Sequence, residues 1–254
     1  MTERSEVRQA RSPVAIVSGG ASGIGAATAA RLAADGYRVV VADRQVDLGK
    51  EHAEAIGGRF AELDVRHSAD WDRVVAEVLA TEGGLDVAHL NAGVTTRQPD
   101  LLALTDEAYD RVVDVNVRGV VSGALAAARA MADRGTGGAL VVTASLAGIL
   151  AFAPDPMYTL TKHAVVGFVR AAAPQLETRG ITINAVCPAV VDTPLLGDEG
   201  RARMAEAGIP IMPASDIADA VVTAIGSGRT GECWTCWPGR PPQVHEFLDP
   251  RPGG

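Results

Sequence analysis

The chain has 254 residues, 47% of them hydrophobic, so it can bury a sizeable core within a single α/β domain. Asp and Glu outnumber Lys and Arg by 31 to 23, which gives a formal net charge of −8. This charge and the lack of a Lys/Arg cluster argue against nucleic acid and anionic membranes as partners. No apolar stretch approaches the roughly 20 residues of a membrane-spanning helix.

The two ends of the chain differ in composition from its middle. We expect a disordered tail over residues 1–12, one domain over 13–240 and a C-terminal extension over 241–254. The polar start lacks the apolar region of a secretory signal. The three cysteines are an odd number, which suits a reducing compartment. We therefore expect a cytoplasmic protein.

Apolar runs rich in β-branched residues alternate along the chain with Ala- and Leu-rich segments of helical length. The predicted strands are residues 14–17, 39–42, 60–63, 87–90, 139–142 and 181–186. The predicted helices include residues 24–35, 71–81, 108–133 and 157–178. Strands that are apolar throughout are typical of a parallel sheet covered on both faces. The sequence therefore predicts a doubly wound α/β fold.

Small or polar residues follow every one of these predicted strands. They are residues 18–25, Asp43, Asp64, residues 91–93, Ser145 and residues 187–193. An open parallel sheet binds its ligands at the carboxyl ends of the strands. Six strand ends of this composition on one edge of the sheet therefore predict a continuous cleft.

A glycine-rich loop, Ser18-Gly19-Gly20-Ala21-Ser22-Gly23-Ile24-Gly25, follows the first strand and opens the first helix. Glycines at such a place let the backbone approach a pyrophosphate, which the N–H groups at the helix start then hold. The spacing is G-x-x-x-G-x-G, and by itself it also fits a plain tight connection. Its place after the first strand, with an acid ending the second, favours a dinucleotide site.

Asp43 is that acid, and it can accept hydrogen bonds from the ribose hydroxyls of an adenosine. Its charge would repel a 2′-phosphate, so we expect NAD in preference to NADP, although Arg44 offers a 2′-phosphate a partner. Asp64 and Val65 end the third strand and are expected to contact the adenine. The alternative for Asp64 is a turn residue that caps the helix near Ser68.

Tyr158 and Lys162 stand four residues apart, which places them on one face of a helix. A cation at this distance favours the phenolate, so we expect Lys162 to lower the pKa of Tyr158 from its usual value near 10. A general acid/base works best with a pKa near the operating pH. In isolation the Y-x-x-x-K spacing is common and would indicate an ordinary surface pair.

The order of these motifs makes the pattern specific. It runs through Gly19-x-x-x-Gly23-x-Gly25, Asn91-Ala92-Gly93, Asn116, Ser145, Tyr158-x-x-x-Lys162 and residues 188–193. The sequence resembles the short-chain dehydrogenase/reductase family from about Pro13 to Gly239. The resemblance implies a Rossmann-type domain with a parallel seven-stranded sheet, a nicotinamide cofactor and assembly as a homotetramer or dimer.

The resemblance also assigns functional residues. The implied catalytic residues are Asn116, Ser145, Tyr158 and Lys162. The implied cofactor-binding residues are Gly19, Ser22, Gly23, Ile24, Gly25, Asp43, Asp64, Val65, Asn91, Ala92, Gly93, Tyr158, Lys162, Pro188, Val191 and Thr193. Tyr158 would exchange a proton with a secondary alcohol or ketone while hydride moves to or from nicotinamide. Ser145 would hold the substrate oxygen, and Lys162 would bond the nicotinamide ribose.

Two positions depart from the family pattern at the cofactor site. Leu90 replaces the first Asn of the family's Asn-Asn-Ala-Gly, from which we expect little effect. Ala189 stands where the family usually has Gly, and Ala tolerates a positive φ poorly. We therefore expect the loop that carries Val191 and Thr193 to follow a different path.

Metal binding is not expected, because the Cys233-x-x-Cys236 pair lies in a predicted strand and its two side chains would face opposite sides. Apolar residues after Ser145 and over 195–212 suggest an apolar substrate pocket, although they can equally seal the core. The C-terminal extension is expected either to reach a neighbouring subunit or to cover the edge of the last strand.

Two functions are compatible with this pattern. The first is an NAD-dependent oxidoreductase that uses Tyr158 as its acid/base. The second is a non-catalytic NAD(H)-sensing protein with the same fold, which would need only the glycine loop and Asp43. The presence of Ser145, Tyr158 and Lys162 together favours the enzyme.

Overall fold

A computed structural model describes residues 11–98 and 100–248 of the chain. Most of the predicted tail, residues 1–10, lies outside the described residues, as do residues 249–254 of the predicted extension. Arg11 belongs to the ordered part, because its guanidinium donates two hydrogen bonds of 2.8 Å to the Asp86 carboxylate. Arg11, which the sequence assigns to the tail, is therefore held against the domain.

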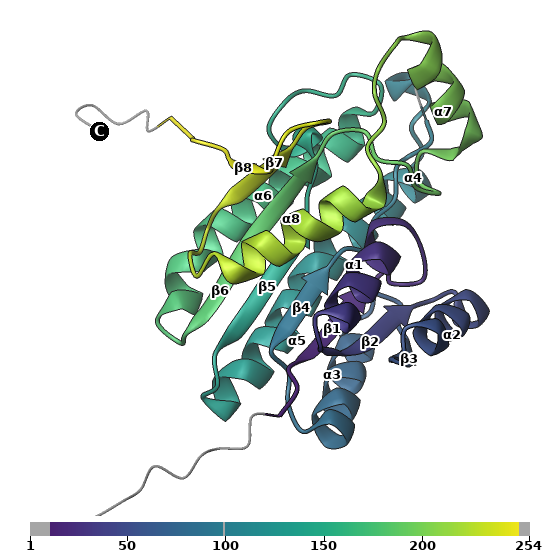
Figure 1. Ribbon diagram of the computed structural model, residues 1–254. Helices are drawn as coiled ribbons and strands as arrows, with labels where there is room; N and C mark the ends of the chain where they lie inside the picture. Colours follow the sequence, from purple (N-terminus) through teal and green to yellow (C-terminus); the bar gives the residue numbers. More distant parts are fainter. Residues whose placement is uncertain (1–10, 99, 249–254) are drawn as a thin grey trace, which may run out of the picture.

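A central sheet of eight strands runs through the molecule (Figure 1). Its strands are β1 (Val14–Ser18), β2 (Arg38–Asp43), β3 (Arg59–Glu62), β4 (Val87–Leu90), β5 (Gly138–Thr143), β6 (Ile181–Pro188), β7 (Cys233–Cys236) and β8 (Gln243–Val244). Their order across the sheet is β3-β2-β1-β4-β5-β6-β7-β8. Strands β1 to β7 are parallel, and β8 pairs antiparallel with β7. The doubly wound α/β fold is therefore confirmed, with eight strands where seven were predicted.

The additional strand comes from the C-terminal extension. Beyond β7 the chain turns back, so that Gln243 and Val244 lie beside Thr235 and Trp234. The backbone N–H of His245 then donates to the carbonyl of Cys233 at 2.7 Å. Of the two roles expected for the extension, its described part covers the sheet edge.

The helices connect the strands. They are α1 (Gly23–Ala34), α2 (Val46–Ala55), α3 (Ser68–Glu82), α4 (Asp106–Val113), α5 (Gly119–Arg134), α6 (Pro156–Glu177), α7 (Gly197–Glu206) and α8 (Ala214–Gly226). Two 3₁₀ turns, η1 (Leu101–Ala103) and η3 (Leu146–Gly148), and a π-helical segment, η2 (Asp114–Arg118), complete the set. The single helix predicted over residues 108–133 is thus divided into α4, η2 and α5.

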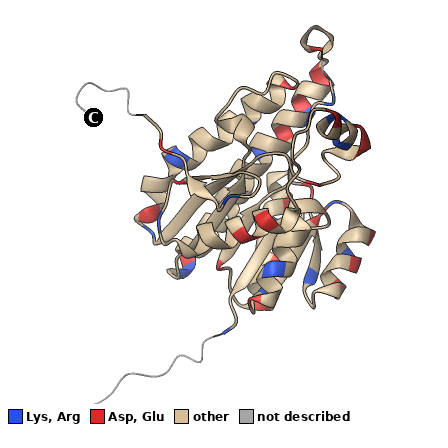
Figure 2. Cartoon of the chain, turned by 45° about the horizontal axis from the view of Figure 1, so that its top comes forward, with Lys and Arg blue, Asp and Glu red and all other residues tan. Residues whose placement is uncertain are grey.

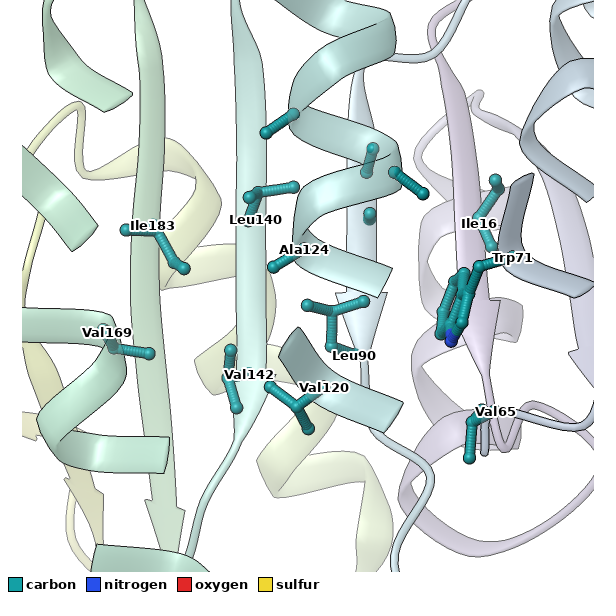
Figure 3. Close-up of a cluster of buried hydrophobic side chains, with 14 of the residues drawn as sticks. Ile16, Val65, Trp71, Leu90, Val120, Ala124, Leu140, Val142, Val169 and Ile183 are labelled. Atoms are coloured by element: carbon teal, nitrogen blue, oxygen red, sulfur yellow. The ribbon is translucent and has the colours of Figure 1, made fainter. Parts of the chain in front are cut away.

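Two layers of helices cover the sheet. Helices α1 and α8 pack together on one face (Figure 1), while α3, α5 and α6 cover the other. The larger core cluster lies between the sheet and that second layer. Figure 3 shows Leu90 and Leu140 of the sheet facing Val120 and Ala124 of α5, with Trp71 from α3 beside them. Strands buried on both faces explain why their sequences are apolar throughout.

The strand order reverses between β1 and β4, which are neighbours in space but not in sequence. The connections that leave these two strands run to opposite faces of the sheet, so their carboxyl ends leave a crevice between them. The glycine-rich loop follows β1 and Asn91-Ala92-Gly93 follows β4, so both lie at this crevice. The fold therefore positions the two motifs side by side.

Charged residues lie mainly on the helices and loops, while the strands are largely uncharged (Figure 2). In that view the Lys and Arg positions are dispersed among those of Asp and Glu. Among the described residues, the structure contains no helix that is both long and apolar enough to cross a membrane.

Candidate active site

The glycine-rich loop joins β1 to α1 at the crevice. Gly19 has a φ of +66°, and a Cβ there would lie 2.9 Å from the Cα of Ala92. A Cβ on Gly25 would lie only 2.1 Å from the carbonyl oxygen of Gly19. The backbone is therefore packed too closely for side chains at either position. Ser22 is the N-cap of α1, and its side chain makes no capping hydrogen bond.

Asp43 lies at the end of β2 with its carboxylate turned toward the glycine-rich loop. One oxygen accepts a hydrogen bond from the N–H of Ala21 at 3.1 Å, and the other accepts from the N–H of Gln45 at 3.0 Å. A carboxylate offers about four acceptor positions, so two remain for a ligand. Asp43 is 7% exposed, whereas Arg44 is exposed.

Asn91 ties the glycine-rich loop to the middle of the sheet. Its amide nitrogen donates to the carbonyls of Ser18 and Gly19 at 3.1 and 3.3 Å. Its amide oxygen accepts from the Thr143 hydroxyl at 3.0 Å. Both ends of the Asn91 side-chain amide are therefore hydrogen-bonded within the protein, and the amide nitrogen fixes the glycine-rich loop. The neighbouring Ala92 lies against Gly19.

A buried histidine, which the sequence analysis did not single out, belongs to the same network. His89 lies on β4, and its Nε2 is 2.8 Å from the Thr143 hydroxyl oxygen. Because that hydroxyl donates to Asn91, His89 must donate from Nε2. Burial lowers the pKa of His89 to about 3, so the ring stays neutral. The sequence gives one sign of this buried role, namely that His89 is a polar residue within the apolar run of β4.

Asn116 is completely buried in the π-helical segment η2. Its amide oxygen accepts from the N–H of Val94, and its amide nitrogen donates to the carbonyl of Val94 and to the Thr161 hydroxyl, at 2.8, 2.8 and 3.0 Å. These bonds join the loop after β4 to helix α6. Such π-helical segments are frequent at functional sites.

Ser145, Tyr158 and Lys162 come together at the carboxyl end of β5. Ser145 follows the strand and caps η3, where its hydroxyl accepts from the N–H of Ala147 at 3.1 Å. Tyr158 and Lys162 lie one turn apart on α6, with the Lys162 ammonium 5.5 Å from the centre of the Tyr158 ring. The ammonium donates to the carbonyl of Thr143 at 2.7 Å. The predicted grouping of these three residues is therefore present.

Burial dominates the proton affinity of the two helix residues. Loss of hydration raises the pKa of Tyr158 to about 12, although a side-chain interaction with Ser145 lowers it. The charges of Asp155 and Cys187 raise it further. The expected lowering of the Tyr158 pKa by Lys162 is therefore wrong for this chain. Burial also lowers the pKa of Lys162 itself, to about 8. Lys162 therefore begins to lose its positive charge only slightly above neutral pH.

Replacing Lys162 with Met should remove a pH dependence from stability. The folded pKa of about 8 lies below the unfolded value of 10.5, so folding disfavours the charged form. Wild-type stability should therefore rise, relative to the variant, by about 3 kcal/mol between pH 8 and pH 10.5. Urea unfolding at several pH values measures the difference. A constant difference over this range would show that Lys162 is not buried as described.

The loop after β6 carries Val191 and Thr193 back to the glycine-rich loop. Val191 forms an isolated parallel bridge with Met212. The side chain of Thr193 lies against Gly23, so close that a Cβ on Gly23 would be 3.0 Å from the Thr193 methyl group. Ala189 does not adopt a positive φ, since Arg97 is the sole non-glycine residue that does so among those the structure describes. Ala is thus accommodated without backbone strain. Pro188 ends β6 and is buried.

Asp64 and Val65 lie just beyond the end of β3, and each has contacts within the protein. The Asp64 carboxylate accepts four hydrogen bonds from Arg66, one from its backbone N–H and three from its guanidinium, and this partner lowers the pKa of Asp64 to about 2. Asp64 does not cap α3, whose N-cap is His67. Val65 is 8% exposed and packs in the core beside Gly119. The Asp64 carboxylate could therefore accept a hydrogen bond from adenine only while it also binds Arg66.

The apolar residues expected near the substrate differ in how exposed they are. Leu146 and Met212 are buried in the core. Leu150 and Phe152 are exposed, and the Phe152 ring stands edge-on to that of Tyr158, with 6.4 Å between centroids. Leu195 and Ile209, from the segment over residues 195–212, are exposed as well, at 40% and 43% of their surface.

The cysteines are buried and unpaired by disulfides. Cys233 faces the core layer of α5 and α6, while Cys236 faces that of α8, so the two side chains lie on opposite sides of the sheet as predicted. Within residues 11–98 and 100–248, no group of three or more His, Cys, Asp or Glu residues could hold a metal ion.

Comparisons with known proteins agree with this geometry. A family profile described as short chain dehydrogenase matches residues 13–203. Short-chain dehydrogenase reductase ATA1 of Arabidopsis thaliana is 35% identical over 87% of this chain and 80% of its own length. The (-)-isopiperitenol/(-)-carveol dehydrogenase of Mentha piperita is 39% identical over 80% of this chain and 78% of its own.

A solved structure shows the same architecture. The short-chain type dehydrogenase/reductase from Mycobacterium marinum superimposes with a TM-score of 0.83 and 29% identity, over 89% of this chain and 94% of that one. Profile, relatives and architecture all agree with the motifs at the crevice. The chain therefore belongs to the short-chain dehydrogenase/reductase family and is an oxidoreductase.

Proposed function

We propose that this protein is a cytoplasmic, NAD-dependent oxidoreductase that interconverts a secondary alcohol and a ketone, with Tyr158 as general acid/base. The observation that carries the proposal is the convergence of Ser145, Tyr158 and Lys162 beside the glycine-rich crevice. A protein that only senses NAD(H) would need the crevice but not this group. The enzyme is therefore favoured over the sensor.

The crevice fits a nicotinamide dinucleotide. The close backbone packing at Gly19 and Gly25 and the free Ser22 side chain at the start of α1 suit a pyrophosphate. Asp43 retains acceptor positions for the ribose, and the loop of Val191 and Thr193 would hold the nicotinamide end. When bound, the cofactor supplies hydride transfer, and the protein supplies alignment.

The chain's own residues would handle the proton. With a pKa of about 12, Tyr158 carries its proton at neutral pH and can donate it to a carbonyl oxygen held by Ser145. The reverse reaction needs the phenolate, so it should become faster as the pH rises. Lys162 lies under the Tyr158 ring, from where its ammonium would reach a nicotinamide ribose.

The substrate is proposed to be a mainly apolar small molecule. Leu150 and Phe152 expose apolar surface, and the Phe152 ring stands edge-on to the Tyr158 ring. The relative named for isopiperitenol and carveol supports an alcohol of this kind. The test is a panel of steroid, terpenoid and aromatic secondary alcohols and ketones, followed by NADH absorbance.

We also propose that the protein assembles as a homotetramer or dimer. Helices α5 and α6 expose Leu125 and Leu160 to solvent, at 44% and 48% of their surface. Exposed apolar residues on adjacent helices support an interface between copies of the chain. Light scattering of the purified protein gives the mass that decides between monomer and oligomer.

Asp43→Ala should reduce the preference for NAD over NADP. Wild-type protein should bind NAD more tightly, because the carboxylate meets a 2′-phosphate with like charge. Removing that charge should reduce the ratio of NAD affinity to NADP affinity about tenfold. Arg44→Ala should have the opposite effect, since NADP should then bind more weakly than it does to the wild type. Fluorescence titration with each cofactor measures the affinities. Equal or tighter NADP binding by the wild type would mean that Arg44, and not Asp43, sets the choice.

A further inference from the structure

Asp155 immediately precedes the catalytic helix and is 5% exposed. Its Oδ1 accepts a hydrogen bond of 2.9 Å from the N–H of Tyr158, as an N-cap residue does. Its Oδ2 accepts a second bond, of 2.8 Å, from the N–H of Thr96. Thr96 lies 59 residues away in the loop after β4. One buried carboxylate therefore joins two segments of the active site.

The loop that Asp155 holds is fixed at several points. Arg111 of α4 donates to the carbonyls of Thr95 and Thr96, at 3.1 and 2.9 Å. Asn116 holds Val94 by both its N–H and its carbonyl. The loop therefore connects directly to Asn91-Ala92-Gly93 on one side and to Asp155 on the other, and its shape depends on groups from α4, η2 and α6.

We propose that Asp155 is a positioning residue for the oxidoreductase reaction, since its carboxylate fixes the start of the catalytic helix to the loop that follows β4. The inference rests on the proposed function. An ordinary N-cap would need only the bond to Tyr158. The second bond, to Thr96, gives Asp155 a role that another capping residue cannot take over.

The charge of Asp155 also acts on the phenol of Tyr158. Burial is the main cause that raises the pKa of this phenol; Ser145 lowers the pKa, Asp155 and Cys187 raise it further, and the Lys162 ammonium lies 5.5 Å from the ring centre. Removing the Asp155 charge removes one of the two groups that raise the pKa. The phenolate should then form at a lower pH than in the wild type.

Asp155→Ser and Asp155→Asn separate capping from positioning. Serine caps helices well, so it can keep the bond to Tyr158, but its single short side chain cannot also accept from Thr96. Asparagine keeps the size of the side chain and loses its charge and one acceptor oxygen. Both variants should lower kcat/KM about tenfold and move the alkaline limb of alcohol oxidation to lower pH. Thr105→Ala, which removes the cap of α4, is the control and should leave that limb in place.

Hydrogen exchange provides a second readout that needs no turnover. The backbone N–H of Thr96 should exchange about tenfold faster in Asp155→Ser than in the wild type, because it loses its acceptor. Faster exchange together with the lower kcat/KM and the shifted limb supports the proposal. Wild-type exchange, rate and pH profile in Asp155→Ser would overturn it. Failure of the proposed function would be seen separately, as full activity of Tyr158→Phe.

Discussion

Replacing Tyr158 with Phe should reduce turnover by about a thousandfold, because only the oxygen that transfers the proton is removed. The phenyl ring still packs against Phe152 and above Lys162, so the helix should keep its shape. NAD affinity should stay within a few-fold of the wild type, since the glycine-rich loop and Asp43 are unchanged. Steady-state kinetics and a cofactor titration measure the two effects on the same preparation.

Tyr109→Phe is the matched control for this variant. Tyr109 lies on α4 with 42% of its surface exposed, and the same hydroxyl is removed there. Its rate should equal that of the wild type. A wild-type rate for Tyr158→Phe would rule out the proposed acid/base even if fold and cofactor are as described. Loss of NAD binding in the same variant would show that the substitution damages the site as a whole.

Gly25→Ala should abolish cofactor binding and destabilise the fold. A Cβ at this position would lie 2.1 Å from the carbonyl oxygen of Gly19 and 2.7 Å from the Asn91 amide, so the loop must move. Overpacking of this kind costs about 1–3 kcal/mol. The loss of binding should be larger, because the displaced backbone is the part that faces the pyrophosphate. Thermal unfolding and titration with NAD measure the two effects.

Gly226→Ala provides the comparison within a helix. Gly226 ends α8 and has no atom within 4 Å of the position that a Cβ would take. This variant should bind NAD normally and be as stable as the wild type or slightly more stable, because Ala has the higher helix propensity. Equal behaviour of the two variants would contradict a close-packed glycine-rich loop.

The main strands and the order of motifs could be predicted because they depend on local patterns. Runs such as residues 39–42 are apolar on every position, which is what burial on both faces requires. The eighth strand could not be predicted, since β8 has two residues and follows a Pro-rich segment without alternation. Its pairing depends on the turn that brings Val244 beside Trp234.

The parts of the site that sequence reasoning missed depend on contacts between distant segments. The division of one predicted helix at η2 accompanies the bonds of Asn116 to Val94 and Thr161, which lie 22 and 45 residues away. The second bond of Asp155 reaches Thr96 in the same way. Neither contact leaves a signal in the local sequence.

The pKa of Tyr158 was predicted in the wrong direction for a related reason. The spacing to Lys162 gives the distance between two residues on a helix, but it says nothing about burial. In the fold, burial raises the pKa of Tyr158 and lowers that of Lys162, so it opposes the effect expected from the pair. The sequence places Tyr158 and Lys162 on one face of a helix, while their pKa values depend on the packed structure.

In the proposed reaction, hydride moves directly between nicotinamide and the substrate carbon while Tyr158 moves the proton. The most direct test uses NADH that carries deuterium at C4, with a ketone that the panel identifies as a substrate. Mass spectrometry of the alcohol should then find one deuterium on the carbinol carbon with the wild type, and product formation should almost cease with Tyr158→Phe. Product without deuterium from either C4 position, or labelled product formed equally fast by Tyr158→Phe, would contradict the account.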